Sequence, residues 1–96
     1  MALSRDEVVE RLRECPWWAF EGTALTRTLP FPTFADAIAF VTRLAFDAEG
    51  ADHHPDLQIN YRKVVVRWST HSEGGVTAKD FVGVQQTEKA FARFTR

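Results

Sequence analysis

The chain has 96 residues, of which 45% are hydrophobic and 12% aromatic, which excludes a disordered segment and suits one folded domain. Its formal net charge of -1, without a Lys/Arg block, gives no electrostatic basis for direct binding to nucleic acid or to an anionic membrane. No apolar run approaches the roughly 18 residues that indicate a membrane span. We therefore expect a single domain over residues 1–96.

The cysteine content and the first residues bear on the cellular compartment. Cys15 is the sole cysteine, which excludes an intrachain disulfide and is typical of a reducing compartment. The opening stretch MALSRDEVVE is charged and has no apolar secretory core. These features predict a cytoplasmic protein. We expect Cys15 to be a small, partly buried residue at a helix end and not a reactive thiol.

Three segments, SRDE, TFAD and TAKD, begin with a hydroxyl residue and place an acid three positions later. The hydroxyl can cap the first amides of a helix, and the acid suits the positive end of the helix dipole. We expect the first helix to end near Pro16, because proline disfavours its continuation. The second and third helices should follow Thr33 and Thr77. The second carries a strong apolar stripe, with Phe40 alongside it, that consists of Phe34, Ala37, Ile38, Val41, Leu44, Ala45 and Ala48.

Alternating and β-branched residues between these helices predict strands. Leu25, Arg27 and Leu29 occupy alternate positions and so fall on one face of a strand, and Glu21-Gly22 is the expected turn before them. Further along, residues 57–61 alternate and VVVRW follows, with a hairpin turn expected at Arg62-Lys63. The order α-β-β-α-β-β-α predicts an α+β fold, a four-stranded antiparallel sheet with three helices packed on one face.

The chain contains three histidines, each at the end of a predicted element. His53 and His54 follow the second helix, and His71 follows the strand that ends at Thr70. Imidazoles titrate near neutral pH, so two or three around one pocket can act as acid and base. Because Pro55 favours an extended backbone at His54, the two neighbouring rings should point apart. One pocket holding both would need a bend near His53 or a substrate lying against both.

Two other readings of the histidines stay open on spacing alone. Two adjacent histidines before a proline have surface or helix-capping roles about as often as they form part of a functional site. A metal site could draw further ligands from Glu49, Asp52 or Asp56. However, adjacent histidines lack the i, i+4 spacing with which a helix presents two imidazoles on one face.

A longer set of spacings resembles the pterin-4a-carbinolamine dehydratase family. That family's pattern is an acid, three residues, His-His-Pro, five residues, Tyr, nine residues, His, eight residues and Asp. The chain has this spacing, and its stretches LTRTLPFPTFADAIAFVTRLAFDAEGADHHP and THSEGGVTAKD are similar to the family's flanking segments. The matching residues are Glu49, His53, His54, Pro55, Tyr61, His71 and Asp80. Trp68 departs from the pattern, at a position that is aliphatic in the family, and we expect a packing or interface role for it.

The resemblance implies an enzyme that converts 4a-hydroxytetrahydrobiopterin, or a related carbinolamine, to quinonoid dihydropterin and water. It implies His53, His54 and His71 as catalytic residues, with Glu49, His54 and Asp80 binding the substrate. His53 and His71 would protonate the departing hydroxyl, and His54 would take the N5 proton. It implies no cofactor and no metal, because no electrons are exchanged. Asp80 also fits the third residue of a helix cap, and Tyr61 fits the core or the hairpin better than catalysis.

The same resemblance implies a homodimer or homotetramer. Family members also include dimerisation cofactors of a transcription factor and assembly-type binding modules on the same scaffold, which is the alternative function. A stripe on the third helix could serve such an interface, and its residues are Phe81, Val84, Phe91 and Phe94. The retained histidines favour the enzyme, because an adaptor needs no imidazoles at these spacings.

Overall fold

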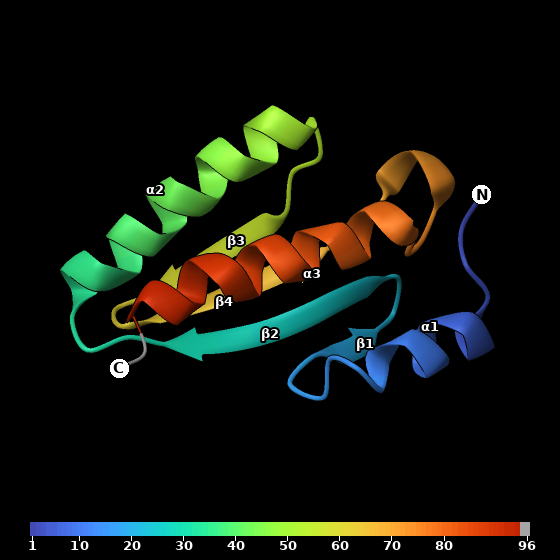
Figure 1. The fold of residues 1–96 in the computed structure, drawn as a ribbon, viewed down its shortest axis with the longest axis horizontal. Helices are drawn as coiled ribbons and strands as arrows, with labels where there is room; N and C mark the ends of the chain where they lie inside the picture. Colours follow the sequence, from blue (N-terminus) through green and yellow to red (C-terminus); the bar gives the residue numbers. More distant parts are fainter. Residues whose placement is uncertain (95–96) are drawn as a thin grey trace.

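Two β-hairpins form one antiparallel sheet in the computed structural model, which describes residues 1–94 (Figure 1). The first hairpin joins β1 (Ala19–Glu21) to β2 (Ala24–Pro30), and the second joins β3 (Asp56–Asn60) to β4 (Lys63–Trp68). The strands lie in the order β1-β2-β4-β3, so β2 and β4 are central and β3 is an edge.

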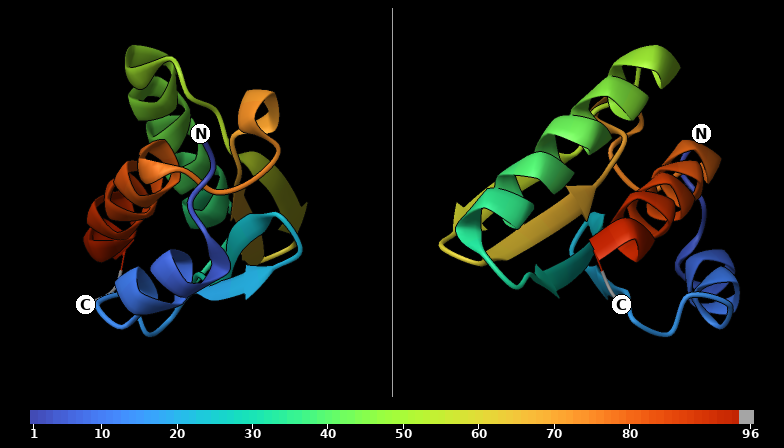
Figure 2. Two further views of the ribbon diagram at one scale, coloured as in Figure 1. Left: turned by 90° about the vertical axis from the view of Figure 1, so that its right-hand side faces the viewer. Right: turned by 60° about the vertical axis from the view of Figure 1, so that its left-hand side comes forward.

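The helices lie on one side of this sheet. They are α1 (Arg5–Leu12), α2 (Phe34–Ala51) and α3 (Ala78–Phe91), with short 3-10 turns η1 (His71–Glu73) and η2 (Ala92–Phe94). Figures 1 and 2 show α2 and α3 side by side over the sheet and α1 beside β1. This architecture confirms the predicted α+β fold and its element order. No helix within residues 1–94 is long and apolar enough to cross a membrane.

The predicted capping residues begin the helices. The Ser4 hydroxyl accepts from the Glu7 amide, and the Glu7 carboxylate accepts from the Ser4 amide. At the start of α2, the Thr33 hydroxyl accepts from the Asp36 amide at 3.0 Å. These local hydrogen bonds satisfy amides that have no partner inside the helix. The capping prediction is therefore confirmed at α1 and α2.

The core lies between the inner face of the sheet and the two long helices. As predicted, Leu25, Arg27 and Leu29 point to this face, where the Arg27 guanidinium pairs with Glu88 of α3 and lies over the Phe91 ring. The inner residues of β4 are completely buried, namely Val64, Val66 and Trp68. Aromatic rings close the end of the core near η2, and these are Phe31, Phe40, Phe91 and Phe94.

Both hairpin turns lie one residue away from their predicted positions. Asn60 pairs with Lys63, so the second turn is Tyr61-Arg62 and the prediction of Arg62-Lys63 was wrong. Tyr61 has a φ of 54°, a positive value that suits the twist of a two-residue hairpin loop, and its exposed ring lies outside the core. The first turn uses Gly22, with a φ of 62°, followed by Thr23, and Glu21 belongs to β1.

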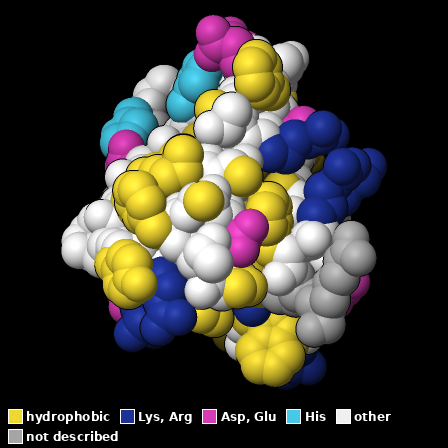
Figure 3. All heavy atoms as spheres, turned by 90° about the vertical axis from the view of Figure 1, so that its left-hand side faces the viewer, with side chains coloured by type: hydrophobic (Ala, Val, Ile, Leu, Met, Phe, Trp, Pro, Cys, Tyr) yellow, Lys and Arg dark blue, Asp and Glu magenta, His cyan; other side chains and the backbone are white. Residues whose placement is uncertain are grey.

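The predicted apolar stripes were partly misassigned. On α2, Phe34 and Ile38 are exposed, and the buried residues are Ala37, Phe40, Leu44 and Ala48. The α3 stripe was considered as an interface, but its residues Phe81, Val84 and Phe91 are buried in the core. Large apolar side chains are exposed on α2, at Phe34, Ile38 and Phe46, and on the β3–β4 hairpin, at Ile59 and Tyr61, and we call these five residues the outer face. Figure 3 shows hydrophobic side chains gathered on one side of the molecule, with histidines at its margin.

Candidate functional site

The end of α2 places the two neighbouring histidines. Asp52 caps the helix with a left-handed φ of 52°, which turns the chain toward β3. The His53 amide still donates to the Ala48 carbonyl, at 3.2 Å. The chain therefore bends immediately before His53, at the place where the sequence requires a bend if the two rings are to serve one substrate.

His53 is held by a buried carboxylate. Its Nε2 lies 2.6 Å from Oδ1 of Asp80, whose side chain is 0% exposed. The other carboxylate oxygen, Oδ2, accepts from the Thr77 amide at 2.9 Å and from the Thr70 hydroxyl at 2.8 Å. Asp80 therefore serves both as the third residue (N3) of the capping box that Thr77 begins at α3, as the sequence predicts, and as the partner of a histidine.

A chain of hydroxyl groups supports Asp80 from behind. Thr70 Oγ1 and Thr77 Oγ1 are 2.8 Å apart, and the Lys79 amide donates to Thr77 Oγ1 at 3.2 Å. Because the Thr70 proton goes to Asp80, the Thr77 hydroxyl is the donor to Thr70. Because a carboxylate can only accept, the ionised form of Asp80 pairs with the tautomer in which His53 Nε2 carries the proton. A fully partnered buried network of this kind fixes side-chain positions.

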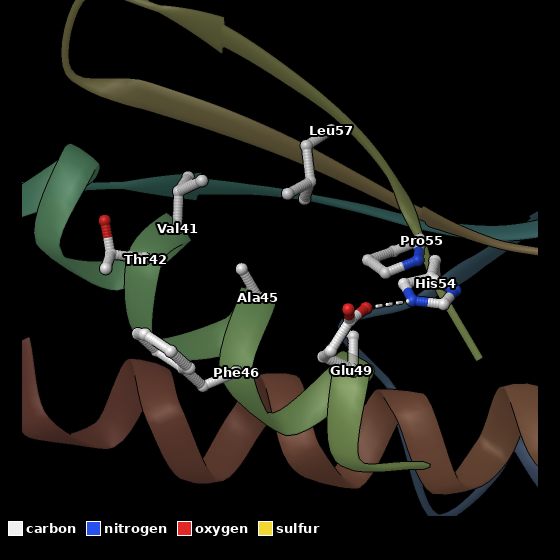
Figure 4. A pocket seen from close by; sticks show the side chains of 9 residues that line it. Val41, Thr42, Ala45, Phe46, Glu49, His54, Pro55 and Leu57 are labelled. Carbon is white, nitrogen blue, oxygen red and sulfur yellow. Dashed lines mark hydrogen bonds and ion pairs between the residues drawn. The ribbon is translucent and has the colours of Figure 1, made fainter. Parts of the chain in front are cut away.

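His54 has a more open environment. Its Nε2 lies 2.7 Å from Oε1 of Glu49, but the two side chains are 55% and 79% exposed. The pair forms one end of a pocket of about 520 Å³ between α2 and β3 (Figure 4). The rest of the pocket is largely apolar, and its lining includes Val41, Ala45, Phe46, Pro55 and Leu57.

His71 is exposed at the first position of η1. Its neighbour Thr70 donates to Asp80, so one carboxylate ties the His53 ring to the start of the turn that carries His71. Figures 1 and 2 show η1 and the loop after α2 at the same end of the molecule. The rings of His53 and His54 line two different pockets.

The structure also bears on the metal and thiol alternatives. Within residues 1–94, no group of three or more His, Cys, Asp or Glu side chains is arranged to hold a metal ion. Cys15 is partly buried, as expected. Burial, followed by the negative charges of Glu14 and Glu88, raises the pKa of its thiol and so disfavours the reactive thiolate.

The structure is thus an α+β protein with two histidine–carboxylate pairs near the end of the sheet where β3 begins. Residues 1–90 match the family model described as pterin 4 alpha carbinolamine dehydratase. A Roseiflexus castenholzii protein provisionally named as such a dehydratase is 47% identical over 79 residues, covering 82% of this chain and 85% of the relative. A Sulfolobus acidocaldarius protein with the same provisional name is 44% identical, covering 84% and 89%. The chain belongs to the pterin-4a-carbinolamine dehydratase family.

Solved structures agree with this membership. A Brucella melitensis protein described as a transcriptional coactivator/pterin dehydratase is 34% identical, with a TM-score of 0.85 and coverage of 99% of this chain and 100% of that one. A pterin dehydratase-like protein described as a RuBisCO assembly factor in the alpha-carboxysome shares the fold, with a TM-score of 0.67, 17% identity and coverage of 77% and 88%. The family supports a dehydratase activity, and the scaffold also occurs in proteins described by other roles.

Sequence reasoning missed two kinds of residue around the site. The support that the Thr70 hydroxyl gives Asp80 was missed, although Thr70 lies in the family-like THSEGGVTAKD segment, whereas the cap contact between Thr77 and Asp80 was predicted. The apolar pocket was also missed. Phe46 was not assigned to the predicted stripe, and Ala45 was assigned to the core, because the period of an amphipathic helix does not show where one face ends.

Proposed function

We propose that the chain catalyses dehydration of a tetrahydropterin 4a-carbinolamine, such as 4a-hydroxytetrahydrobiopterin, to quinonoid dihydropterin and water in tetrahydrobiopterin recycling. Family membership supports the reaction class. The observation that carries the proposal to this chain is the 2.6 Å contact between His53 and the buried Asp80. A histidine held in this way has one ring nitrogen fixed and the other left for proton transfer.

The reaction needs one proton delivered and one removed. The C4a–O bond breaks as an acid protonates the departing hydroxyl, and a base takes the proton from N5 as the C4a–N5 double bond forms. No electron is exchanged, so imidazoles that titrate near neutrality are sufficient. We therefore propose that the reaction uses neither a metal nor an organic cofactor.

We assign His53 and His71 to protonation of the departing hydroxyl, and His54 to binding the pterin and accepting the N5 proton. Glu49 pairs with His54 and would contribute to substrate binding from the same rim. For Asp80 we propose orientation of His53 in place of the direct pterin contact that the family resemblance implies, because its carboxylate is completely buried.

The pocket between α2 and β3 is a suitable place for part of the substrate. Its volume of about 520 Å³ lies within the range of small-molecule sites, and its apolar walls suit a flat bicyclic ring. His53 and His71 lie outside its lining, so we propose that the reacting edge of the pterin extends beyond His54, across the end of the sheet where β3 begins and β4 ends.

A stopped-flow assay tests the proposed reaction. The carbinolamine is generated in the instrument and its breakdown is followed by absorbance with and without the protein. We expect a rate that increases in proportion to protein concentration, and identical rates in both cases would overturn the proposal. A chain with His53, His54 and His71 all changed to alanine is the control for buffer and surface effects.

We also propose a homodimer or homotetramer, working in the cytoplasm. The outer face exposes large apolar side chains, including Phe46 at 73% and Phe34 at 50%, and exposed apolar surfaces of this kind mark interfaces. Light scattering should therefore give a multiple of the 10.9 kDa chain mass at micromolar concentration. A single-chain mass would contradict this expectation, and Phe46→Glu should shift the wild-type assembly toward it.

The alternative function is a binding module, either a dimerisation cofactor or an assembly factor. The Brucella melitensis neighbour is described partly as a transcriptional coactivator, and the outer face offers a surface for a protein partner. The histidines separate the two functions. Alanine at all three should abolish dehydration, whereas binding through the outer face should survive this change.

A further inference from the structure

The indole of Trp68 packs against the imidazole of His53. The two ring centroids are 5.6 Å apart and the planes differ by 23°, which is a stacked arrangement. Trp68 is completely buried, so the stack is a fixed part of the core. We propose that Trp68 is a positioning residue for His53, an inference that rests on the proposed dehydration and names a further residue on which its rate depends.

Trp68 is itself held firmly by α3. Its Nε1–H donates to the Thr87 hydroxyl at 2.9 Å, and that hydroxyl donates to the Gly83 carbonyl at 2.8 Å. A Cβ atom added to Gly83 would lie 2.3 Å from Cδ2 of the indole and 2.5 Å from Cε2 and Cε3. The indole therefore contacts the helix backbone directly, because residue 83 is glycine, and it has no room to tilt toward α3.

Two contacts then determine the orientation of the His53 ring. Asp80 fixes the edge that carries Nε2, and Trp68 fixes the plane of the ring. The bond between an imidazole and its Cβ has a broad torsional preference, so such a ring keeps one angle only when its surroundings impose it. With Nε2 and the plane both fixed, Nδ1 is held in one direction.

His53 remains accessible from outside, although Trp68 is buried. The His53 side chain is 15% exposed, and with Trp68 it lines a pocket of about 120 Å³ that also includes Lys79, Val82 and Gln86. A group that transfers protons must be both oriented and reachable, and His53 meets both conditions. A small error in its direction would lower the rate strongly, since misplacement by about 1 Å can reduce turnover by roughly 10²-fold.

The role of Trp68 goes beyond filling space. An aliphatic side chain, the type found at this position in the family pattern, could fill part of the same volume but offers no flat surface to an imidazole. Val66 lies two residues earlier on the same buried face of β4 and is equally inaccessible. Val66→Ala is therefore a matched control that weakens the core without removing the stack.

The test compares Trp68→Leu, Trp68→Phe and Val66→Ala with the wild type, at a temperature where all are folded. We expect Trp68→Leu to lower kcat roughly 10- to 100-fold while KM stays within about twofold, because the ring is misdirected and the substrate pocket is intact. Trp68→Phe should recover most of kcat, since it restores a flat ring. Val66→Ala should keep the wild-type kcat.

Proton NMR of the imidazole rings gives a readout that does not depend on activity. Stacking on an indole should move the His53 ring signals upfield of those of His54 and His71, and Trp68→Leu should abolish this displacement. Thr87→Val, which removes the anchor of the indole but little volume, should give a smaller change in kcat and in these signals. It keeps the proposal testable if Trp68→Leu fails to fold.

The outcomes separate the inference from the proposed function. If the wild type is active and Trp68→Leu keeps the wild-type kcat, the role of Trp68 is overturned and the proposed function is not. The same holds if Trp68→Leu leaves the NMR signals of the His53 ring at their wild-type positions. If Trp68→Leu does not fold, unchanged kcat and unchanged signals in Thr87→Val would overturn it in the same way. A wild type without dehydratase activity would overturn the proposed function and the role of Trp68 with it, while the NMR signals would still report the stack.

Discussion

The two neighbouring histidines form chemically similar pairs in opposite surroundings. His53 meets Asp80 at 2.6 Å inside the protein, with Thr70 and Thr77 completing the carboxylate's hydrogen bonds. His54 meets Glu49 at 2.7 Å on the surface, where both side chains are mostly exposed. Distance therefore does not distinguish the pairs, and burial does.

This difference determines what each pair can do. A buried ion pair or hydrogen-bonded pair is costly to break, because the remaining partner has no water to replace it. A surface pair contributes about 0–1 kcal/mol and its members move freely. We infer that the His53 pair is a fixed element of the site and that the His54 pair is an adjustable one, able to reorganise around a substrate.

The largest effect should come from removing the buried carboxylate. Asp80→Ala leaves His53, the Thr70 hydroxyl and the Thr77 amide without their acceptor, and we expect it to lower the free energy of unfolding by about 3–5 kcal/mol. Glu49→Ala should change it by no more than about 0.5 kcal/mol. Urea denaturation measures both, and equal losses would remove the distinction between the pairs.

The next effect concerns turnover and not stability. His54→Ala and His71→Ala should each lower the dehydration rate by at least about 10²-fold, the typical loss for a general acid or base. Both side chains are exposed, so circular dichroism and the unfolding midpoint should stay close to those of the wild type. If these two variants and His53→Ala all kept the wild-type rate, the roles assigned to the histidines would be wrong.

A smaller effect tests the support behind Asp80. Thr70→Val removes a hydroxyl that donates to Asp80 and accepts from Thr77, and we expect a loss of about 1–3 kcal/mol in unfolding free energy. Thr70→Ser keeps the hydroxyl and should lose much less. A Val variant as stable as the Ser variant would show that the hydroxyl chain contributes nothing.

The smallest effect is that of salt on the surface pair. At a pH where His54 is protonated, a double-mutant cycle between His54 and Glu49 should give a coupling below about 0.5 kcal/mol at low salt that disappears near 1 M NaCl, because exposed charges are screened. The corresponding cycle for His53 and Asp80 should change little with salt. Coupling energies that respond equally to salt would contradict the assigned difference in burial.

Local chemistry explains which parts of the fold were predictable. The caps at Ser4, Thr33 and Thr77 involve residues within three positions of each other, so sequence alone predicts where each helix begins. The hairpin turn at Tyr61 was misplaced by one residue, because a tyrosine at positive φ has no local indication and the pairing of β3 with β4 decides the register.

In the candidate site too, the sequence predicts individual residues but not the contacts between residues far apart in the chain. Spacing and family resemblance identified His53, His54 and His71, and the cap pattern identified Asp80. The contact between His53 and Asp80 joins residues 27 positions apart and depends on how α3 packs over β4, which no local pattern specifies. The packing role expected for Trp68 agrees with its complete burial, but its stack on His53 required the tertiary structure.

The most direct test of the central claim is the stopped-flow dehydration rate of Asp80→Asn beside that of the wild type. Asparagine keeps the shape of the side chain, and its carbonyl can still accept from the Thr77 amide and the Thr70 hydroxyl. Its amide group would then face His53 Nε2 as a donor and force the ring into the other tautomer. We predict a folded protein whose dehydration rate is at least about 10²-fold lower. A folded Asp80→Asn protein with the wild-type rate would contradict the claim that the buried carboxylate prepares His53 for proton transfer.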